Sequence, residues 1–385
     1  MTHLFENYAR WDVEIVSGSG CKVVDSNGRE YLDFTSGIGV CNLGHCHPAV
    51  VESTTNQLHK IWHTSNLFKS SLQEKVAEKL SSNSIEGSVF FCNSGAEANE
   101  AAIKLARKFT GKSKIITFLQ SFHGRTFATM AATGQDKVKQ GFGSMLETFV
   151  HLPFNDVNEL KKEMDNETAA VMLEVVQGEG GVHIANEEFL TTVEQLCKEY
   201  GAILIIDEVQ TGIGRTGKPF AYQHYNLSPD IITSAKGLGN GFPTGAMIGK
   251  DYLKTAFNPG SHGSTFGGNP LAMSAANATL NLIFEDEFLN EVTEKSDYFA
   301  SKLDEILSSL ENFKGIRHKG LMFGVEFSNE VGSMVSLLRE NGLLALVAGP
   351  NVMRFLPPLT VTYEEMDAVL AIIEGTLLNT KTVTC

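Results

Sequence analysis

The chain has 385 residues, 42% of them hydrophobic and 20% charged, which is ordinary for a soluble globular protein with room for two domains. Its formal net charge of −14 disfavours nucleic acid as a partner, and the sequence contains no basic block. No stretch reaches the roughly 18 apolar residues that a membrane span needs, and no secretory signal is recognised. Six cysteines without a paired pattern favour a reducing compartment. We therefore expect a cytoplasmic protein without nucleic-acid or membrane partners.

The N-terminal 48 residues predict a β-hairpin followed by a turn. Strand-like runs at 21–24 and 30–34 flank Asp25 to Gly28, a typical turn sequence. The segment Cys41–Pro48 then brings two cysteines and two histidines together. A zinc site there is one interpretation, but such sites usually combine two ligand pairs far apart in sequence, and no second pair is found. We favour a structural turn, or a turn at the rim of an active site, and predict no metal.

From residue 48 to about 250, helical and strand patterns alternate along the chain. Most of the strands are uniformly apolar, which indicates a largely parallel sheet that is buried on both faces and carries functional residues at its strand ends. The predicted strands are 88–92, 114–118, 169–175, 202–206, 231–233 and 246–248, and the predicted helices are 48–60, 71–81, 97–110, one ending near 132, and 186–200.

The remainder of the chain is richer in helix and has short strands. We predict a fold of the α/β class with a mainly parallel central sheet in a large domain, 49–274, and a smaller α+β domain formed by 1–48 and 275–385. The expected elements of this part are helices over 271–284, 288–310, 331–341 and from 362, and strands over 317–320, 322–327, 343–347 and 352–356.

Lys236 leaves an apolar strand and enters a glycine-rich turn. Burial of an ammonium group costs free energy and lowers its pKa, which makes the amine a better nucleophile. On this stretch alone, a surface lysine in a loop is the simpler interpretation. The loops at the other strand ends decide between the two.

Two of these loops offer contacts for a phosphate and a carboxylate. Asn93 to Ala96 joins a strand to a helix, whose free N–H groups suit a phosphate, and Gly95 allows close approach. An ordinary helix cap is the alternative. In the next loop Phe122 could lie on a flat ring and Arg125 could bind a carboxylate. A core phenylalanine and a surface arginine are the alternative there.

Asp207 follows an apolar strand directly, so its carboxylate needs a cationic partner or a metal. Beside it, Val209 could pack on a ring and Gln210 could bind a ring hydroxyl. A metal pair made by Asp207 and Glu208 is weakened because no other ligand cluster is evident. The loop with Ser264 and Thr265 is a further phosphate candidate or else a structural loop. An acid, a lysine and a phosphate-binding loop in this order meet the requirements of pyridoxal phosphate.

With these loops in place, the chain resembles the class III pyridoxal-phosphate aminotransferases of fold-type I nearly end to end. Within the class its motifs are most similar to the acetylornithine aminotransferase branch, since the ornithine branch typically has Trp where His123 stands. One departure is minor: Glu174-Val-Val-Gln177 replaces the frequent Glu-Pro-Ile-Gln. The matching segments are Gly37–Pro48, Asn93–Glu100, Phe122–Thr126, Gln177–Gly181, Asp207–Lys218, Lys236, His262–Pro270 and Ala348–Phe355.

The resemblance implies roles for individual residues. Lys236 would form a Schiff base with one cofactor per subunit and move the proton, and Asp207 would pair with the ring nitrogen. Arg125 and Arg354 would bind substrate carboxylates, with Glu179 as a switch that neutralises Arg354. Ser264 would lie near the substrate. The implied cofactor contacts are Gly95, Ala96, Phe122, Asp207, Glu208, Val209, Gln210, Lys236 and, from the neighbouring subunit, Thr265.

The resemblance also implies the reaction and the assembly. It implies a ping-pong transfer of the δ-amino group of N2-acetyl-L-ornithine to 2-oxoglutarate, in arginine biosynthesis, by a homodimer with active sites at the subunit interface. Succinyl-diaminopimelate, ornithine or 4-aminobutyrate aminotransferases of the same class are alternatives, and so is an aminomutase or decarboxylase on the same fold. A non-enzymatic binding protein is disfavoured by the intact Asp207, Lys236 and Arg125.

Overall fold

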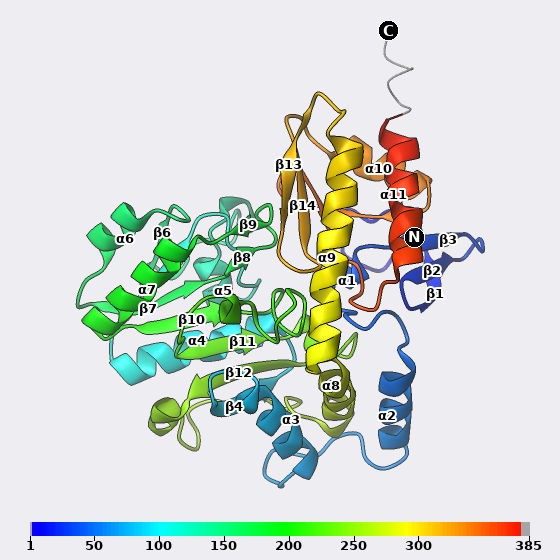
Figure 1. The fold of residues 1–385 in the computed structure, drawn as a ribbon. Helices are drawn as coiled ribbons and strands as arrows, with labels where there is room; N and C mark the ends of the chain where they lie inside the picture. The colour runs from blue at the N-terminus through cyan, green and yellow to red at the C-terminus, as the bar shows by residue number, and fades with distance from the viewer. Residues whose placement is uncertain (1, 379–385) are drawn as a thin grey trace.

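The computed structural model describes residues 2–378, and a seven-stranded sheet forms its centre (Figure 1). Strand β10 pairs in parallel with β7 and β11, and β5 pairs in parallel with β7 and β6, whereas β12 runs antiparallel to both of its neighbours. The predicted mainly parallel sheet is therefore confirmed. In spatial order the strands are β4 (Gly87–Cys92), β12 (Gly245–Lys250), β11 (Ile231–Ser234), β10 (Ile203–Asp207), β7 (Thr168–Leu173), β5 (Lys114–Phe118) and β6 (Phe149–Leu152).

Both faces of this sheet are covered, which explains its uniformly apolar strands. Alternate residues of a strand point to opposite faces. On β10, Ile205 belongs to a core cluster with residues of α4 (Gly95–Thr110), whereas Leu204 and Ile206 belong to the cluster that contains residues of α7 (Glu187–Tyr200). Burial of each such side chain contributes roughly 1.5–3 kcal/mol to folding. Two further helices of this part are α5 (Phe127–Ala132) and α6 (Val157–Glu163).

Segments from both ends of the chain form two other four-stranded sheets. The predicted hairpin is confirmed, and a strand before it extends it. Strand β15 then pairs in parallel with β3, which joins the N-terminal hairpin to the C-terminal region, and the two regions lie side by side at the right of Figure 1. The sheets contain β1 (Ile15–Ser19), β2 (Lys22–Asp25), β3 (Glu30–Asp33) and β15 (Leu343–Leu344), and β13 (Phe313–His318), β14 (Phe323–Phe327), β17 (Val352–Phe355) and β16 (Leu346–Val347).

Long helices connect these sheets with the central one. Helix α9 (Asp286–Leu307) runs past both parts of the molecule in Figure 1, and α11 (Tyr363–Leu377) packs on it. The other helices of this region are α2 (Pro48–Leu58), α3 (Ser71–Ser82), α8 (Pro270–Ile283) and α10 (Gly332–Glu340). Short elements complete the fold: α1 (Ser36–Gly39), β8 (Val176–Gln177), β9 (His183–Ile184), and the 3-10 turns η1 (Asp136–Val138), η2 (Ala221–His224), η3 (Lys236–Leu238) and η4 (Asp251–Ala256).

We keep the division into a large and a small domain as a proposal. The central sheet uses residues from Gly87 to Lys250, and the two four-stranded sheets use residues up to Asp33 and from Phe313 onward. The boundary at 274/275 falls inside α8, which packs on α2 and α3, so a division after α8 keeps that helix whole. Residues 379–385 of the proposed small domain lie outside the described part of the chain.

Candidate active site

The loops singled out at the predicted strand ends meet at one edge of the central sheet. Parallel strands place their carboxyl ends on the same side, and ligands of such sheets bind there. The loops after β4, β5, β7, β10 and β11 together line a cavity of about 450 Å³. This volume suits a small organic cofactor or substrate. Predicted residues in its wall are Gly95, Ala96, Phe122, Arg125, Glu179, Asp207, Val209, Gln210 and Lys236.

Lys236 begins the 3-10 turn that follows β11, and its backbone is strained there. Its φ angle is 44°, which is a conformation that residues with a side chain rarely adopt and that is often kept at functional sites. The next residue must be glycine, because a Cβ on Gly237 would lie 2.3 Å from Asn42 Nδ2. Burial lowers the pKa of Lys236 to about 8. Nζ makes no hydrogen bond or ion pair with any residue that the structure describes, so the amine is available for chemistry.

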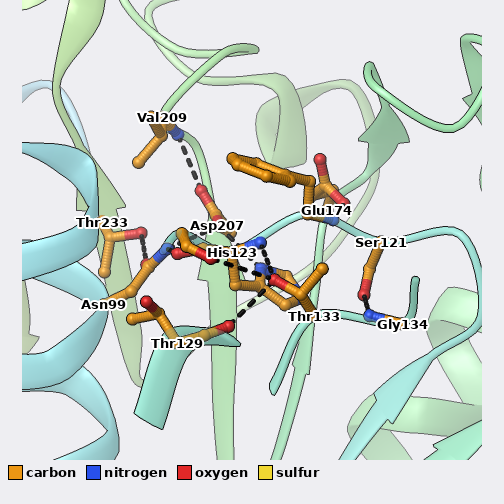
Figure 2. Close-up of polar contacts among 12 residues, drawn as sticks. Asn99, Ser121, His123, Thr129, Thr133, Gly134, Glu174, Asp207, Val209 and Thr233 are labelled. Atoms are coloured by element: carbon orange, nitrogen blue, oxygen red, sulfur yellow. Dashed lines mark hydrogen bonds and ion pairs between the residues drawn. The ribbon is translucent and has the colours of Figure 1, made fainter. Parts of the chain in front are cut away.

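Asp207 lies at the end of β10 and is held by donors on both oxygens (Figure 2). Asn99 Nδ2 and His123 Nδ1 donate to Oδ2 over 2.8 and 2.7 Å, and the Val209 N–H donates to Oδ1 over 3.0 Å. Asn99 is itself oriented, because Thr233 Oγ1 donates to its Oδ1 over 2.7 Å. The carboxylate is 3% exposed. It is therefore a fixed anion at the floor of the cavity, able to pair with a cationic ring atom.

The N-terminus of α4 offers unpaired N–H groups to the cavity. Ser94 caps the helix by accepting the Glu97 N–H over 3.2 Å. The N–H groups of Gly95 and Ala96 have no acceptor among residues 2–378, and both residues line the cavity. A side chain at Gly95 is excluded, since its Cβ would lie 2.6 Å from Val209 Cγ1. This terminus could hold an anionic group such as phosphate.

Phe122 and Arg125 come from the loop after β5. The guanidinium carbon of Arg125 lies 5.6 Å from the centre of the Phe122 ring, at cation–π distance. Phe122 is half-buried and Arg125 is exposed. Arg125 thus stands as an open cation in the wall of the cavity, where it could bind a carboxylate.

Arg354 of β17 is buried behind the cavity wall and is paired with Glu179. Its Nη1 donates to Glu179 Oε1 over 2.7 Å, to the Gly178 carbonyl oxygen over 2.8 Å and to Gln210 Oε1 over 3.2 Å. Gln210 Nε2 donates to the same Glu179 oxygen over 3.1 Å. Burial alone would raise the pKa of Glu179, but the charges of Arg354 and Lys236 outweigh it and lower the pKa to about 2. Glu179 therefore covers and neutralises Arg354.

Three predicted contacts lie elsewhere. Glu208 is buried outside the cavity, where its carboxylate accepts from the Tyr222 N–H over 2.8 Å and from Thr211 Oγ1. Burial raises the pKa of Glu208 to about 7. Ser264 lies near the rim, where its Oγ accepts from Asn93 Nδ2 over 3.1 Å. Thr265 is exposed and does not line the cavity.

The turn at Cys41–Pro48 carries no metal cluster, and no group of metal-ligating side chains is found anywhere in the described chain. His45 Nε2 instead lies 2.7 Å from Asp33 Oδ2, which makes an ion pair and raises the pKa of His45 to about 10. Val40, just before the turn, lines the cavity. The interpretation as a turn at the rim of the site fits this position.

Sequence reasoning assigned no role to Asn99, His123 or Glu174, although all three line the cavity. A signal for Glu174 was present, since it follows an apolar strand as Asp207 does. Asn99 is an amide among the alanines of the buried face of α4, and such a residue needs a partner. Nothing in its neighbourhood along the chain points to Asp207, which lies 108 residues away.

Known proteins are similar to this chain over nearly its whole length. The family model "Aminotransferase class-III" matches residues 6–377. An acetylornithine aminotransferase from Bacillus anthracis is 59% identical over 97% of both chains. Among solved structures, an N-acetylornithine aminotransferase from Stenotrophomonas maltophilia has a TM-score of 0.86 at 36% identity over 98% of each chain. An ornithine aminotransferase from Toxoplasma gondii, with PLP at partial occupancy in its active site, has a TM-score of 0.94 at 32% identity over 99% of this chain and 93% of its own.

No helix within the described chain has the length and hydropathy that crossing a bilayer requires. The match to the family model covers nearly all of the chain, and the cavity has the lysine, carboxylate and helix N-terminus expected from the motifs. The chain therefore belongs to the class III aminotransferase family.

Proposed function

We propose that this chain is an acetylornithine aminotransferase that transfers the δ-amino group of N2-acetyl-L-ornithine to 2-oxoglutarate. The products are N-acetyl-L-glutamate 5-semialdehyde and L-glutamate, and the step belongs to arginine biosynthesis. One observation carries the proposal: the cavity of Lys236 has an open cation, Arg125, in its wall, and a second cation, Arg354, lies buried behind the wall and is neutralised by Glu179. The relative from Bacillus anthracis, 59% identical, is an acetylornithine aminotransferase.

The residues of the cavity fit pyridoxal 5'-phosphate, one molecule per subunit. When bound, this cofactor supplies an aldehyde that accepts an amino group and a ring that takes up electrons from the reacting carbon. The free N–H groups of Gly95 and Ala96 suit its phosphate, and Asp207 is the anion that a protonated ring nitrogen needs. Phe122 and Val209 offer apolar surfaces for the two ring faces.

Lys236 has two tasks in this proposal. Its uncharged amine, which the lowered pKa favours, would hold the cofactor through the cofactor aldehyde. As the free amine, Nζ would take a proton from the reacting carbon of the substrate and return it. The lack of a hydrogen-bond partner within the described chain leaves Nζ able to do both. Gln210 keeps a second amide N–H beyond the one given to Glu179, and we assign it to the ring hydroxyl.

The two cations explain how one cavity serves two substrates. The donor carries one carboxylate, which we assign to Arg125, and enters with an amine at its far end, where Glu179 keeps Arg354 neutralised. The acceptor is a dicarboxylate, so it needs Arg354 as well, and Glu179 must then move aside. We assign Ser264, whose Oγ accepts from Asn93 of the cavity wall, to a position near the bound substrate. Binding by two arginines also fixes the orientation of the acceptor for reaction.

A substrate panel tests the proposal. We expect kcat/KM to be highest for N2-acetyl-L-ornithine among that compound, succinyl-diaminopimelate, ornithine and 4-aminobutyrate, with 2-oxoglutarate as acceptor and glutamate as the measured product. A preference for free ornithine or 4-aminobutyrate would reassign the substrate within the class. Failure to form glutamate from any donor would instead favour an aminomutase or decarboxylase.

We further propose a cytoplasmic homodimer with its active sites at the subunit interface, in which Thr265 reaches the phosphate of the neighbouring subunit. Thr265 lies in a loop that Asn66 joins to the segment before α3, since Asn66 Nδ2 donates to the carbonyl oxygens of Ser264 and Gly267. Large apolar side chains are exposed on both segments: Trp62, Leu67, Phe68 and Phe266. Sedimentation equilibrium should give a dimer; a fully active monomer would contradict the shared site.

A further inference from the structure

Glu174 is a buried carboxyl group in the cavity wall that the proposed reaction does not use. It follows β7 directly, beside β10 with its terminal Asp207, and it is 6% exposed. Its Oε2 accepts the backbone N–H of Phe122 over 3.0 Å, an interaction between residues 52 positions apart. The stick view in Figure 2 shows its carboxyl group above the cluster around Asp207. Glu174 thus links the end of β7 to the loop that carries Phe122.

The charges around Glu174 oppose its ionisation. Burial raises its pKa well above the ordinary value, and the nearby charge of Asp207 raises it further. The negative charge of Glu179 also disfavours the charged form of Glu174, whereas the Phe122 N–H and Lys236 favour it. Glu174 makes no ion pair within the described chain, whereas Asp207 has three hydrogen-bond donors and Glu179 has Arg354. Burial and the neighbouring carboxylates therefore favour the uncharged form of the Glu174 carboxyl group.

The loop that Glu174 holds carries both Phe122, the apolar surface proposed for the cofactor ring, and Arg125, the exposed cation of the site. Ser121 and His123 are both tied to the end of α5: Ser121 Oγ accepts from the Gly134 N–H, and the His123 N–H donates to Thr133 Oγ1 over 2.9 Å. Between them, the Phe122 N–H donates to Glu174, and Arg125 lies over the Phe122 ring. Loss of the Glu174 acceptor would leave the Phe122 N–H without this partner and would weaken the placement of the ring on which Arg125 rests.

Resting on the proposed function, we propose that Glu174 is a positioning residue for substrate binding: through its hydrogen bond to the backbone N–H it fixes Phe122, and through the Phe122 ring it fixes Arg125. Glu174 therefore acts on the carboxylate of the substrate without touching it.

The test uses the cofactor-loaded enzyme and two substitutions that differ in one property. Glu174→Gln keeps an acceptor for the Phe122 N–H and carries no charge, so KM and kcat should match the wild type at every pH between about 6 and 9. Glu174→Leu removes the acceptor, so KM for both substrates should rise about tenfold while kcat and the cofactor absorption band change little. A large loss in Glu174→Gln, or a pH profile displaced from that of the wild type, would show that a negative charge at this position is needed and would overturn a role as hydrogen-bond acceptor alone. A wild-type KM in Glu174→Leu would overturn the positioning role.

A double substitution identifies the route to the substrate. If Glu174 acts through Arg125, Glu174→Leu should add little to the loss in kcat/KM caused by Arg125→Ala, whereas independent residues give additive losses. Additive losses would overturn the route through Arg125. If Glu174→Leu does not fold, the comparison of Glu174→Gln with the wild type still decides. Binding of glutarate, followed by calorimetry without turnover, separates this proposal from the proposed reaction: glutarate should bind about tenfold more weakly to Glu174→Leu even if the substrate assignment is wrong.

Discussion

Two carboxylates of the cavity are held in opposite ways. Asp207 is 3% exposed and receives three hydrogen bonds from groups that are themselves fixed, so it has one stable position. The Glu179 side chain is 30% exposed, and one of its oxygens is shared between Arg354 and Gln210. Arg354 would keep Gly178 and Gln210 as acceptors if Glu179 moved away.

This difference matches two proposed functions, one needed in both half-reactions and one needed only while the amine donor is bound. A carboxylate that pairs with the cofactor ring is needed in both half-reactions, so rigidity is an advantage there. A carboxylate that neutralises Arg354 must leave for the dicarboxylate, so it has to be exposed and replaceable. Lys236 lines the same cavity as both carboxylates, and in the proposed function it is needed in both half-reactions.

The largest effect is expected from Lys236→Arg, which should leave both carboxylates in place. A guanidinium group is always charged and is not a nucleophile, so transamination should fall at least about 1,000-fold while the melting temperature changes little. Single-turnover kinetics and thermal unfolding measure the two. Turnover close to that of the wild type would contradict the role of Lys236.

Glu179→Gln should abolish the neutralisation of Arg354 and leave the contacts of Asp207 unchanged. Without the charge of Glu179, Arg354 is no longer neutralised, so kcat/KM for the amine donor should fall about tenfold relative to that for 2-oxoglutarate. Rapid-mixing measurements of each half-reaction give this ratio. An unchanged ratio would show that Glu179 does not control Arg354.

His123→Phe should remove one of the hydrogen bonds that hold Asp207, with a smaller effect on the reaction rates. The Phe ring fills a similar volume, and Asn99 remains to hold Asp207 Oδ2, so both half-reactions should slow by about tenfold or less and by the same factor. A matched control is Asn99→Ala, which removes the other donor to the same oxygen. Loss of only one half-reaction would instead give His123 a role in one half-reaction alone, as proposed for Glu179.

The smallest effect is expected from pH. The pKa of Glu179 is lowered to about 2 in the folded protein, so the carboxylate stays charged above that pH and loses its charge only as the pH falls through about 2. The ratio of the two half-reactions should therefore stay constant between about pH 6 and 9, even though the rates change as Lys236, with a pKa near 8, loses its proton. A ratio that changes within this range would indicate a titrating switch.

Sequence patterns predicted the central sheet well because its strands are apolar throughout. They failed where burial is partial or pairing is remote. Strand β6 has mostly half-buried residues and includes a histidine, so no apolar run marks it. The single strand predicted at 343–347 is divided at Ala345, because β15 pairs with the N-terminal β3 and β16 pairs with β17.

The candidate site divides in the same way. The loops with Lys236, Asp207, Gly95 and Arg125 were predictable because each follows a strand of one parallel sheet, so chain order places them at one edge. The contacts of Asn99 and Glu174 depend on partners that the fold brings together from far along the chain. Resemblance to a family names a motif residue but does not give its direction, which is why Glu208 was expected in the cavity.

The most direct test of the difference between Asp207 and Glu179 measures both half-reactions in Glu179→Gln and His123→Phe under the same conditions. We expect the ratio of donor to acceptor kcat/KM to fall about tenfold in Glu179→Gln and to equal the wild-type ratio in His123→Phe, where both rates fall together. A ratio that changes equally in both variants, or in neither, would contradict the view that Asp207 is fixed in both half-reactions whereas Glu179 moves between them.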